Sequence, residues 1–422
     1  MLEQYKQLKG EKQFLKMLVA DFISGFGSTI DNIAIPWLVY MITGDPVWVA
    51  IIFGSAYVPT IVLSPVLGVF IEKMSKKKVL LFSDICGVAL MVLLAVLFLS
   101  DMLNPWILLA IVFVNSCIEA IRNPAGVAII PEILSAENYN VGMSLSHTLG
   151  RVASLIGLGI TGFLITVFGV QTAVLIDAAT FLCSFLIIAT IRYVQSPVEN
   201  QVSSWNFAEF KASFKEGFDY LINNNIVKYI CFFGIFINFF TVGFSTYLTV
   251  YVKDYMSMGP QFLSILSILF TLGSLLGSLL APNFTAKYSL TKMLPTTGIV
   301  NGAAYVFFAL LLLIPFVPLK LAAAFVVVFL YGLVGGVVGV SVSVGFMTYI
   351  EQSYLARLAS VFNSLVSTAM PVSSALLALL AVFFGVDIIF LFYGILSLII
   401  TFAVMIFFKP DTPPSPDTEV QS

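Results

Sequence analysis

Charged residues are scarce in this sequence. They make up 10% of its 422 residues, whereas a soluble globular domain carries about 25%. Histidine occurs once, and the four cysteines lack the paired spacing of a disulfide framework or a metal site. No glycine-rich phosphate loop followed by Lys and Ser or Thr is present, which argues against direct use of ATP. We therefore expect no metal, no cofactor and no soluble enzyme.

Hydrophobic residues, in contrast, make up 59% of the chain, and they occur in long runs. A helix needs about 20 mainly apolar residues to cross the hydrocarbon core of a bilayer. Twelve runs meet this length. Their approximate limits are 14–42, 47–71, 77–100, 105–124, 141–168, 171–191, 227–251, 260–282, 292–315, 319–346, 357–384 and 387–408. The sequence predicts an all-α membrane protein with twelve transmembrane helices.

The basic residues indicate how these helices are oriented. Lys and Arg concentrate beside the ends of the spans that share a side with the N-terminus, whereas only Lys253 and Lys320 fall on the other side. Cytoplasmic loops carry this excess of basic residues. We therefore expect both termini in the cytoplasm, in a bacterial plasma membrane. The net charge of −2 gives no reason to expect a nucleic acid partner.

A long polar interval divides the spans into two halves. We expect an N-terminal six-helix bundle over 1–192, a cytoplasmic linker over 193–226, a C-terminal bundle over 227–409 and a disordered tail over 410–422. Apolar residues recur every three or four positions between Phe207 and Leu221, which predicts an amphipathic helix in the linker. In the tenth span, glycines recur from Gly332 to Gly345. They indicate either close helix packing or a bending helix.

Several short phrases in both halves are typical of one transporter family. They are Gly68-Val-Phe-Ile-Glu72-Lys73-Met-Ser75-Lys76-Lys77-Lys78, Ala34-Ile-Pro36-Trp-Leu-Val-Tyr40-Met-Ile-Thr43-Gly44, Arg122-Asn-Pro124-Ala, Pro131-Glu132, Ile176-Asp177-Ala-Ala-Thr-Phe181 and Arg357-Leu-Ala-Ser-Val. Together they resemble the major facilitator superfamily, and within it the drug-efflux group that includes the macrolide exporters. The resemblance implies two pseudo-symmetric six-helix bundles, secondary active transport and a monomer in the lipid bilayer.

The same resemblance implies a conformational latch at the loop between the second and third spans. In the family this loop binds the start of the eleventh helix and holds one of two conformations. The corresponding positions here are Gly68, Glu72, Lys73, Lys76, Lys77, Asp84 and Arg357. Alternatively, the lysines only set the membrane topology. Asp84 fits the family as a partner of the same latch, and we expect it to be structural and not substrate-binding.

Ionisable residues inside the predicted spans are few and lie in the N-terminal half. An ionised side chain at the bilayer centre costs about 2.5–3.5 kcal/mol on insertion scales, so each one calls for a reason. Asp31, Glu119 and Arg151 are the candidates for proton coupling. Each has a structural alternative: Asp31 as a packing acid, Glu119 neutralised by Arg122, and Arg151 reaching the membrane surface. Asp177, in the sixth span, fits the family phrase and is expected to be structural.

Polar and aromatic residues in the spans are candidates for a substrate cavity. Pockets for drug-sized molecules are lined by apolar and aromatic side chains with a few polar groups. The candidates are Asn32, Trp37, Tyr57, Asn115, Phe236, Phe240 and Tyr247. Each aromatic residue has packing as its alternative.

The sequence thus predicts a proton-coupled antiporter that exports a small amphiphilic, drug-like molecule by alternating access. An exporter of a siderophore, a lysophospholipid or a peptide with the same fold is the alternative. Two features depart from the family's proton-coupled pattern. The fourth span reads Asn115-Ser-Cys-Ile where many such exporters have an arginine, and the fifth lacks their Gly-Pro step. A membrane enzyme and a passive channel are less consistent with the sequence, because it contains neither clustered catalytic residues nor a ring of like charges.

Overall fold

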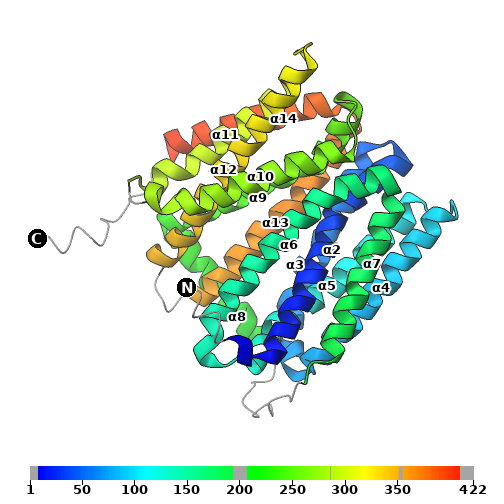
Figure 1. Ribbon diagram of the computed structural model, residues 1–422. Coiled ribbons are helices and arrows are strands. Elements are labelled where there is room, and N and C mark those ends of the chain that lie inside the picture. Colours follow the sequence, from blue (N-terminus) through cyan, green and yellow to red (C-terminus); the bar gives the residue numbers. More distant parts are fainter. Residues whose placement is uncertain (1–7, 193–206, 286, 351–354, 409–422) are drawn as a thin grey trace, which may run out of the picture. The chain divides into compact units, whose positions relative to one another are not determined.

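The computed structural model describes residues 8–192, 207–285, 287–350 and 355–408, and every regular element in these ranges is helical (Figure 1). Within these ranges, twelve helices are long and apolar enough to span a membrane, as the sequence predicts. They are α2 (Lys12–Thr43), α3 (Pro46–Lys73), α4 (Lys76–Leu99), α5 (Pro105–Ile133), α6 (Tyr139–Phe168), α7 (Val170–Ala189), α9 (Asn225–Val250), α10 (Pro260–Thr285), α11 (Leu290–Leu311), α12 (Val317–Tyr349), α13 (Leu355–Ala381) and α14 (Val386–Phe407).

The remaining elements are short or lie in the linker. They are η1 (Leu8–Gly10), η2 (Ala136–Asn138), the linker helix α8 (Phe207–Asn223) and the π-helical turn η3 (Tyr251–Tyr255). Helix α8 covers the segment for which the sequence predicts an amphipathic helix. The first part of the predicted linker and the predicted disordered tail at 410–422 lie outside the described residues.

The described residues group into two compact units. The first takes in those within 1–205 and 246–268, and the second those within 206–245 and 269–422. The ends of α9 and α10 that flank η3 therefore group with α2–α7, which the predicted boundaries at 192 and 227 did not include. Within the first unit, α2 packs along α7 and α6, and α4 packs along α7 and α5.

Local sequence signals account for the helix boundaries in the first unit. Helix α2 ends at Gly44, whose φ of 62° is in the left-handed region that glycine adopts readily. Helix α5 begins after Asn104, whose side chain accepts a hydrogen bond from the Ile107 amide at 2.9 Å, with proline at the first helical position. Two further prolines, Pro124 and Pro131, lie inside α5. The helix continues to Ile133, which corrects the predicted end at residue 124.

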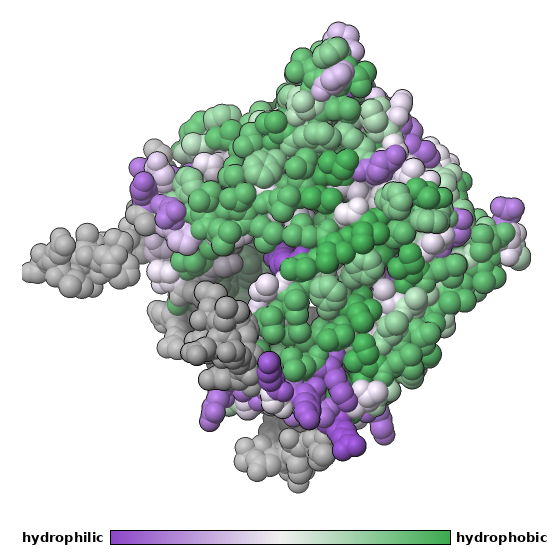
Figure 2. Space-filling model, viewed as in Figure 1, coloured by the Kyte–Doolittle hydropathy of each residue, from purple (hydrophilic) through white to green (hydrophobic). Residues whose placement is uncertain are grey.

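The outer surface of the helices is hydrophobic. Large apolar side chains are highly exposed, such as Phe82 on α4, Phe163 on α6 and Phe407 on α14. Figure 2 shows apolar residues over most of the visible surface, with hydrophilic groups gathered near helix ends. Exposed apolar surface of this extent is what lipid contact requires.

Aromatic rings form the core of the second unit. Tyr305 is 1% exposed, and its hydroxyl donates a hydrogen bond to the Phe240 carbonyl oxygen at 2.6 Å. The rings of Phe244 and Phe308 meet edge to face, with centroids 5.1 Å apart, and Tyr393 stacks on Phe239 at 5.7 Å. Rings packed in this way fill the space between helices and leave few polar atoms unpaired.

Glycines bring α10 and α12 into backbone contact in the second unit. A Cβ atom on Gly277 would lie 2.0 Å from the Leu333 carbonyl oxygen, and one on Gly336 would lie 2.0 Å from the Ser274 carbonyl oxygen. Gly335 and Gly339 have nothing within 4 Å of such an atom. Close packing, one of the two interpretations of the glycine-rich tenth span, therefore accounts for Gly332 and Gly336 but not for Gly335 and Gly339.

Candidate proton and substrate site

Two acids from different helices meet inside the first unit. The side chains of Asp31 of α2 and Asp177 of α7 interact with each other. Asp177 is 0% exposed. Asp31 Oδ1 and Asp177 Oδ2 are buried, and neither meets a donor among the described residues. Ionised carboxylates only accept hydrogen bonds, so a bond between the two groups requires a proton on one of them.

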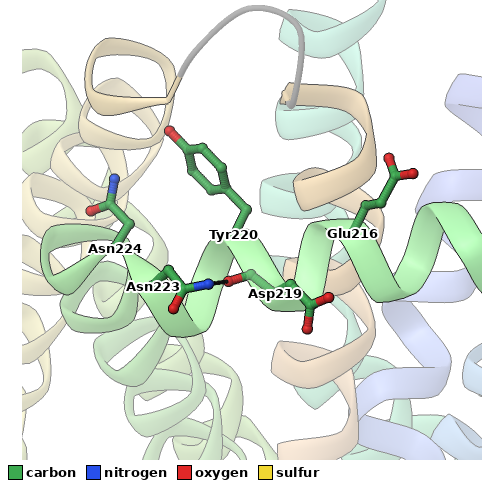
Figure 3. A pocket seen from close by; sticks show the side chains of 5 residues that line it. All are labelled: Glu216, Asp219, Tyr220, Asn223 and Asn224. Carbon is green, nitrogen blue, oxygen red and sulfur yellow. Dashed lines mark hydrogen bonds between the residues drawn. The ribbon is translucent and has the colours of Figure 1, made fainter.

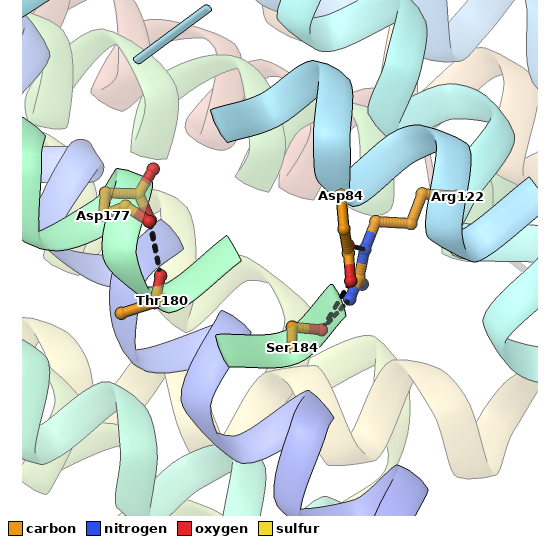
Figure 4. Close-up of polar contacts among 5 residues, drawn as sticks. All are labelled: Asp84, Arg122, Asp177, Thr180 and Ser184. Carbon is orange, nitrogen blue, oxygen red and sulfur yellow. Dashed lines mark hydrogen bonds and ion pairs between the residues drawn. The ribbon is translucent and has the colours of Figure 1, made fainter. Parts of the chain in front are cut away.

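The surroundings of Asp177 fix its position. The Thr180 hydroxyl, one turn along α7, contacts Asp177 Oδ1 at 3.1 Å and the Asp177 carbonyl oxygen at 2.8 Å (Figure 4). On the other side lies Gly27 of α2, where a Cβ atom would be 2.1 Å from Asp177 Oδ1. The close approach of α2 to α7 at Gly27 is what lets the acid one turn later on α2, Asp31, reach Asp177.

A buried ion pair lies beyond these acids. Arg122 Nε of α5 donates to Asp84 Oδ1 of α4 at 2.7 Å, and the Ser184 hydroxyl of α7 donates to Asp84 Oδ2 at 2.7 Å (Figure 4). Arg122 also donates to Ser184 Oγ at 3.3 Å. The sequence offered Arg122 as the neutralising partner of Glu119, one turn away on α5. In the structure the ion pair of Arg122 is with Asp84 from a neighbouring helix, and the charge of Arg122 also acts on Glu119.

Glu119 interacts electrostatically with both the acid pair and the ion pair. Its charge acts on Asp31, on Asp177 and on Arg122. Asp21 of α2 interacts with Arg122 and Asp84 in the same way. The first unit therefore contains five interacting carboxyl groups and one guanidinium group. Ionisation of all five would leave most of this charge uncompensated in an apolar environment, which is energetically costly.

The third residue proposed for proton coupling lies elsewhere. Arg151 of α6 is exposed, and it is not among the groups that act on Asp31, Asp177 or Glu119. The structure does not bring it to the acids.

The polar candidates for the substrate cavity have different environments. Asn32 is exposed, whereas Tyr57 and Asn115 are half-buried. The Asn115 Oδ1 atom is buried and meets no donor among the described residues. An amide oxygen in this state is available to a ligand or to water.

Trp37 lies at the other end of α2 from Asp21 and has a partner within the chain. Lys253 Nζ of η3 is 5.9 Å from the centre of the Trp37 ring and 4.8 Å from that of Tyr40. The Tyr40 hydroxyl donates a hydrogen bond to the Asp254 carboxylate. Trp37 is 8% exposed and Tyr247 is 1% exposed. In this structure Trp37 therefore takes part in a polar cluster with Tyr40 and η3.

Phe236 and Phe240 belong to the second unit and are almost fully buried. Their ring centroids are 4.6 Å apart, and Phe240 also contacts the rings of Tyr305 and Tyr393. Both rings are part of the aromatic core in this structure, which agrees with the packing alternative.

The latch residues whose side chains the structure describes find partners within the first unit. Lys76 forms an ion pair with Glu132 of α5 at 2.7 Å. Lys77 donates to the carbonyl oxygens of Ala189 and Ile191 at 2.8 and 2.7 Å, and so caps the C-terminal end of α7. The structure does not describe the surroundings of Gly68 or the side chains of Glu72, Lys73 and Arg357.

A polar pocket lies where α8 meets α9 in the second unit (Figure 3). Glu216, Asp219, Tyr220, Asn223 and Asn224 line it. The Asn223 side chain donates to the Asp219 carbonyl oxygen at 2.9 Å. These residues belong to the linker region and not to a predicted span, and we assign no transport role to them.

Sequence reasoning singled out Asp31 but did not predict its interaction with Asp177 or the contact of Thr180 with Asp177. It judged Asp177 to be structural, because a sequence shows depth in a span but not the acid that faces it. The available signal was the Asp177-Ala-Ala-Thr180 spacing, which places both side chains on one face of a helix.

The sequence profile described as Major Facilitator Superfamily matches residues 17–373. The chain belongs to the Major Facilitator Superfamily. It is therefore a multi-pass membrane transporter and not an enzyme.

Individual relatives of this transporter are distant. It is 24% identical to macrolide efflux protein A of Streptococcus pyogenes, over 96% of this chain and 97% of the relative. It is 23% identical to the uncharacterized MFS-type transporter YvqJ of Bacillus subtilis, over 85% of this chain and 84% of the relative. The crystal structure of the nucleoside transporter NupG is similar with a TM-score of 0.74 at 14% identity, over 94% of this chain and 100% of NupG. The structural likeness bears on the fold alone.

Proposed function

We propose that this transporter exports a small, amphiphilic, macrolide-like molecule across a bacterial plasma membrane in exchange for protons. The observation that carries this proposal is the pair of interacting acids Asp31 and Asp177, each with a buried oxygen that no donor among the described residues satisfies. A pair that requires a proton, inside a span, is suited to bind and release protons during transport. The similarity to a macrolide efflux protein supports export as the direction and an amphiphilic drug as the cargo.

The membrane can supply the required energy. A proton that moves inward gains about 2.3 kcal/mol per 100 mV of membrane potential. One or two protons per cycle would therefore maintain a large concentration gradient of cargo. The proton moves through the first unit, with Asp31 as its principal carrier and Glu119, whose charge acts on Asp31 and Asp177, as a further carrier.

Membership of the family and the division of the chain into two compact units support alternating access as the mechanism. In this mechanism one half rocks against the other and exposes a central site to each side of the membrane in turn. We propose that the transporter works as a monomer, with both termini in the cytoplasm.

Reconstitution into proteoliposomes tests the proposal. Purified transporter is mixed with lipid, and uptake of a radiolabelled macrolide is followed while a pH gradient and a membrane potential are imposed separately. We expect uptake against a gradient only when one of these forces is present, together with proton efflux from the vesicles. The Asp31→Asn variant should lose the dependence on the pH gradient.

The Asp101→Asn variant is the matched control, because Asp101 is an exposed acid at a left-handed turn position that asparagine also adopts. It should behave as the wild type does. Uptake of a siderophore, lysophospholipid or peptide in place of the macrolide would change the cargo assignment. If the Asp31→Asn protein kept an unchanged dependence on the pH gradient, the coupling assignment would be wrong.

A further inference from the structure

Asp31 and Asp177 are interacting acids at the close approach of α2 and α7. Each acid has a buried oxygen that no donor among the described residues satisfies, Oδ1 of Asp31 and Oδ2 of Asp177. One proton placed between the two carboxyl groups would join them by a hydrogen bond and would remove the repulsion between two carboxylates. Carboxyl groups that interact this strongly titrate as a pair and not as two separate residues.

We propose that Asp31 and Asp177 form a single proton-binding site that shares one proton, with Thr180 and Gly27 as its positioning residues. The shared proton lies between an oxygen of Asp31 and an oxygen of Asp177, and the pair then carries one negative charge. Binding of a second proton neutralises the pair, and its release to water restores the charge. Asp177 is thereby a coupling residue and not only a packing acid. The role of the pair in transport rests on the proposed function, whereas the shared proton itself does not.

The charged groups on the neighbouring helices have other partners or act on this pair only through space. On α5, Glu119 acts on both acids through space, and Arg122 is held by Asp84 of α4. Asp21, on the same helix as Asp31, interacts with Arg122 and Asp84. On α6, which also packs along α2, the ionisable residues Arg151 and His147 are exposed. On α3, Tyr57 is half-buried.

Thr180 holds Asp177 in the orientation that faces Asp31. Its hydroxyl lies within hydrogen-bond distance of Asp177 Oδ1, so this oxygen is satisfied from within α7 while Oδ2 is left without a donor. Gly27 leaves no room for a side chain between the helices, since a Cβ atom would be 2.0 Å from Thr180 Oγ1. Both features are local, and each can be changed without removal of an acid.

Infrared difference spectroscopy of the purified transporter in lipid nanodiscs tests the shared proton. The carbonyl-stretch absorption of protonated carboxyl groups is measured at neutral pH for the wild type, Asp31→Asn, Asp177→Asn and the double variant. Each single variant should lose the absorption of one protonated carboxyl group. The remaining acid is then ionised, because as a carboxylate it can accept a hydrogen bond from the new amide. The double variant should lose no more than either single one, which is the sign of a coupled pair.

Thr180→Val, which removes a hydroxyl from Asp177, should shift the same absorption, and Thr180→Ser should restore it. Thr161→Val is the control, because the buried Thr161 hydroxyl bonds to the Gly157 carbonyl oxygen within its own helix. Elution profile and melting temperature identify any variant that fails to fold. The proposal is overturned if the losses of the two single variants add in the double variant, or if Asp177→Asn leaves the absorption unchanged.

Transport measured on the same proteins separates this inference from the proposed function. In one outcome, the absorption losses are equal and non-additive while both single variants keep uptake driven by the pH gradient. That result would support the shared proton and contradict proton-coupled export. If only Asp31→Asn loses coupling to the pH gradient and the absorption losses add, the result supports the proposed function and contradicts the shared site.

Discussion

Gly27 determines how closely α2 and α7 approach at the acid pair. Replacement by alanine would place a Cβ atom 2.0 Å from Thr180 Oγ1 and 2.1 Å from Asp177 Oδ1, so these side chains or the helices must move. Overpacking of this kind typically costs about 1–3 kcal/mol. We expect Gly27→Ala to lower the melting temperature by several degrees and to weaken coupling to the pH gradient. Thermal unfolding in detergent and uptake into proteoliposomes are the measurements.

Gly25, two residues earlier on α2, is the matched control for Gly27. Nothing lies within 4 Å of a Cβ atom at Gly25, and alanine favours the helix over glycine. Gly25→Ala should therefore retain or slightly raise the melting temperature. Equal melting temperatures for Gly27→Ala and the wild type would contradict the close approach of α2 and α7.

The partners of individual charges could be predicted from the sequence only in part. The depth of Asp31 and Glu119 in their spans is visible in the sequence, because position along a helix follows from residue number. The partner of Arg122 is not, since helical spacing brings Glu119 near while the contact that forms is with Asp84 on another helix. The contact between Asp31 and Asp177 joins the first and sixth spans in the same way. Such contacts depend on how the helices pack, which residue spacing does not encode.

Helices were predicted better than contacts between them. The predicted limits of most spans lie within a few residues of the observed helices, because a membrane imposes both length and apolar composition. Helix α5 is the clear exception. It continues through Pro124 and Pro131, since neighbouring groups in a membrane protein can satisfy the backbone atoms that proline frees.

Helices α10 and α12 provide a test of packing between helix backbones. A Cβ atom on Gly336 would lie 2.0 Å from the Ser274 carbonyl oxygen, and a backbone atom cannot rotate away as a side chain can. We expect Gly336→Ala to separate the two helices and to lower the melting temperature, at a cost of about 1–3 kcal/mol. Small residues at such contacts permit association in lipid, where apolar attraction between helices is weak.

The adjacent Gly335 serves as the control for Gly336, because nothing lies within 4 Å of its Cβ position. Gly335→Ala should not lower the melting temperature of the transporter in detergent. A bending role for the glycines would give the opposite ranking, with Gly335→Ala reducing uptake and Gly336→Ala having no effect on stability.

Glu11 connects the start of α2 to η2 in a manner that depends on pH. Its carboxylate accepts hydrogen bonds from the Ser135 hydroxyl at 2.5 Å and the Asn138 side-chain amide at 3.0 Å. These bonds favour the ionised form and hold the pKa of Glu11 below its ordinary value, with Ser135 the larger cause. Because the folded pKa is the lower one, the contact stabilises this region fully above the unfolded pKa. The stabilisation is lost as pH falls through the folded pKa.

Hydrogen exchange of the first amides of α2, measured from neutral to acidic pH, should report this loss. Protection, corrected for intrinsic exchange rates, should fall in the wild type at pH values below the ordinary pKa of a glutamate. Glu11→Gln should lack that transition, since its side chain does not titrate in this range. The same acid transition in both proteins would mean that another group is responsible.

The orientation of the whole molecule in the membrane follows from its basic residues, and labelling can test it. If the termini are cytoplasmic, the turn between α4 and α5 faces outward and the turn between α5 and α6 faces inward. Asp101 and Glu137 are exposed residues in these two turns. Each can be changed to cysteine in a protein whose four native cysteines are replaced by alanine or serine.

A membrane-impermeant maleimide added to intact cells should label Asp101→Cys and leave Glu137→Cys unlabelled. Both should react after the cells are broken, which shows that each thiol is accessible. The physical reason is the excess of Lys and Arg beside the spans, which remains on the cytoplasmic side during insertion. The reverse labelling pattern would place the termini outside the cell. An inward-moving proton would then pass Asp31 and Asp177 in the opposite direction along the helices.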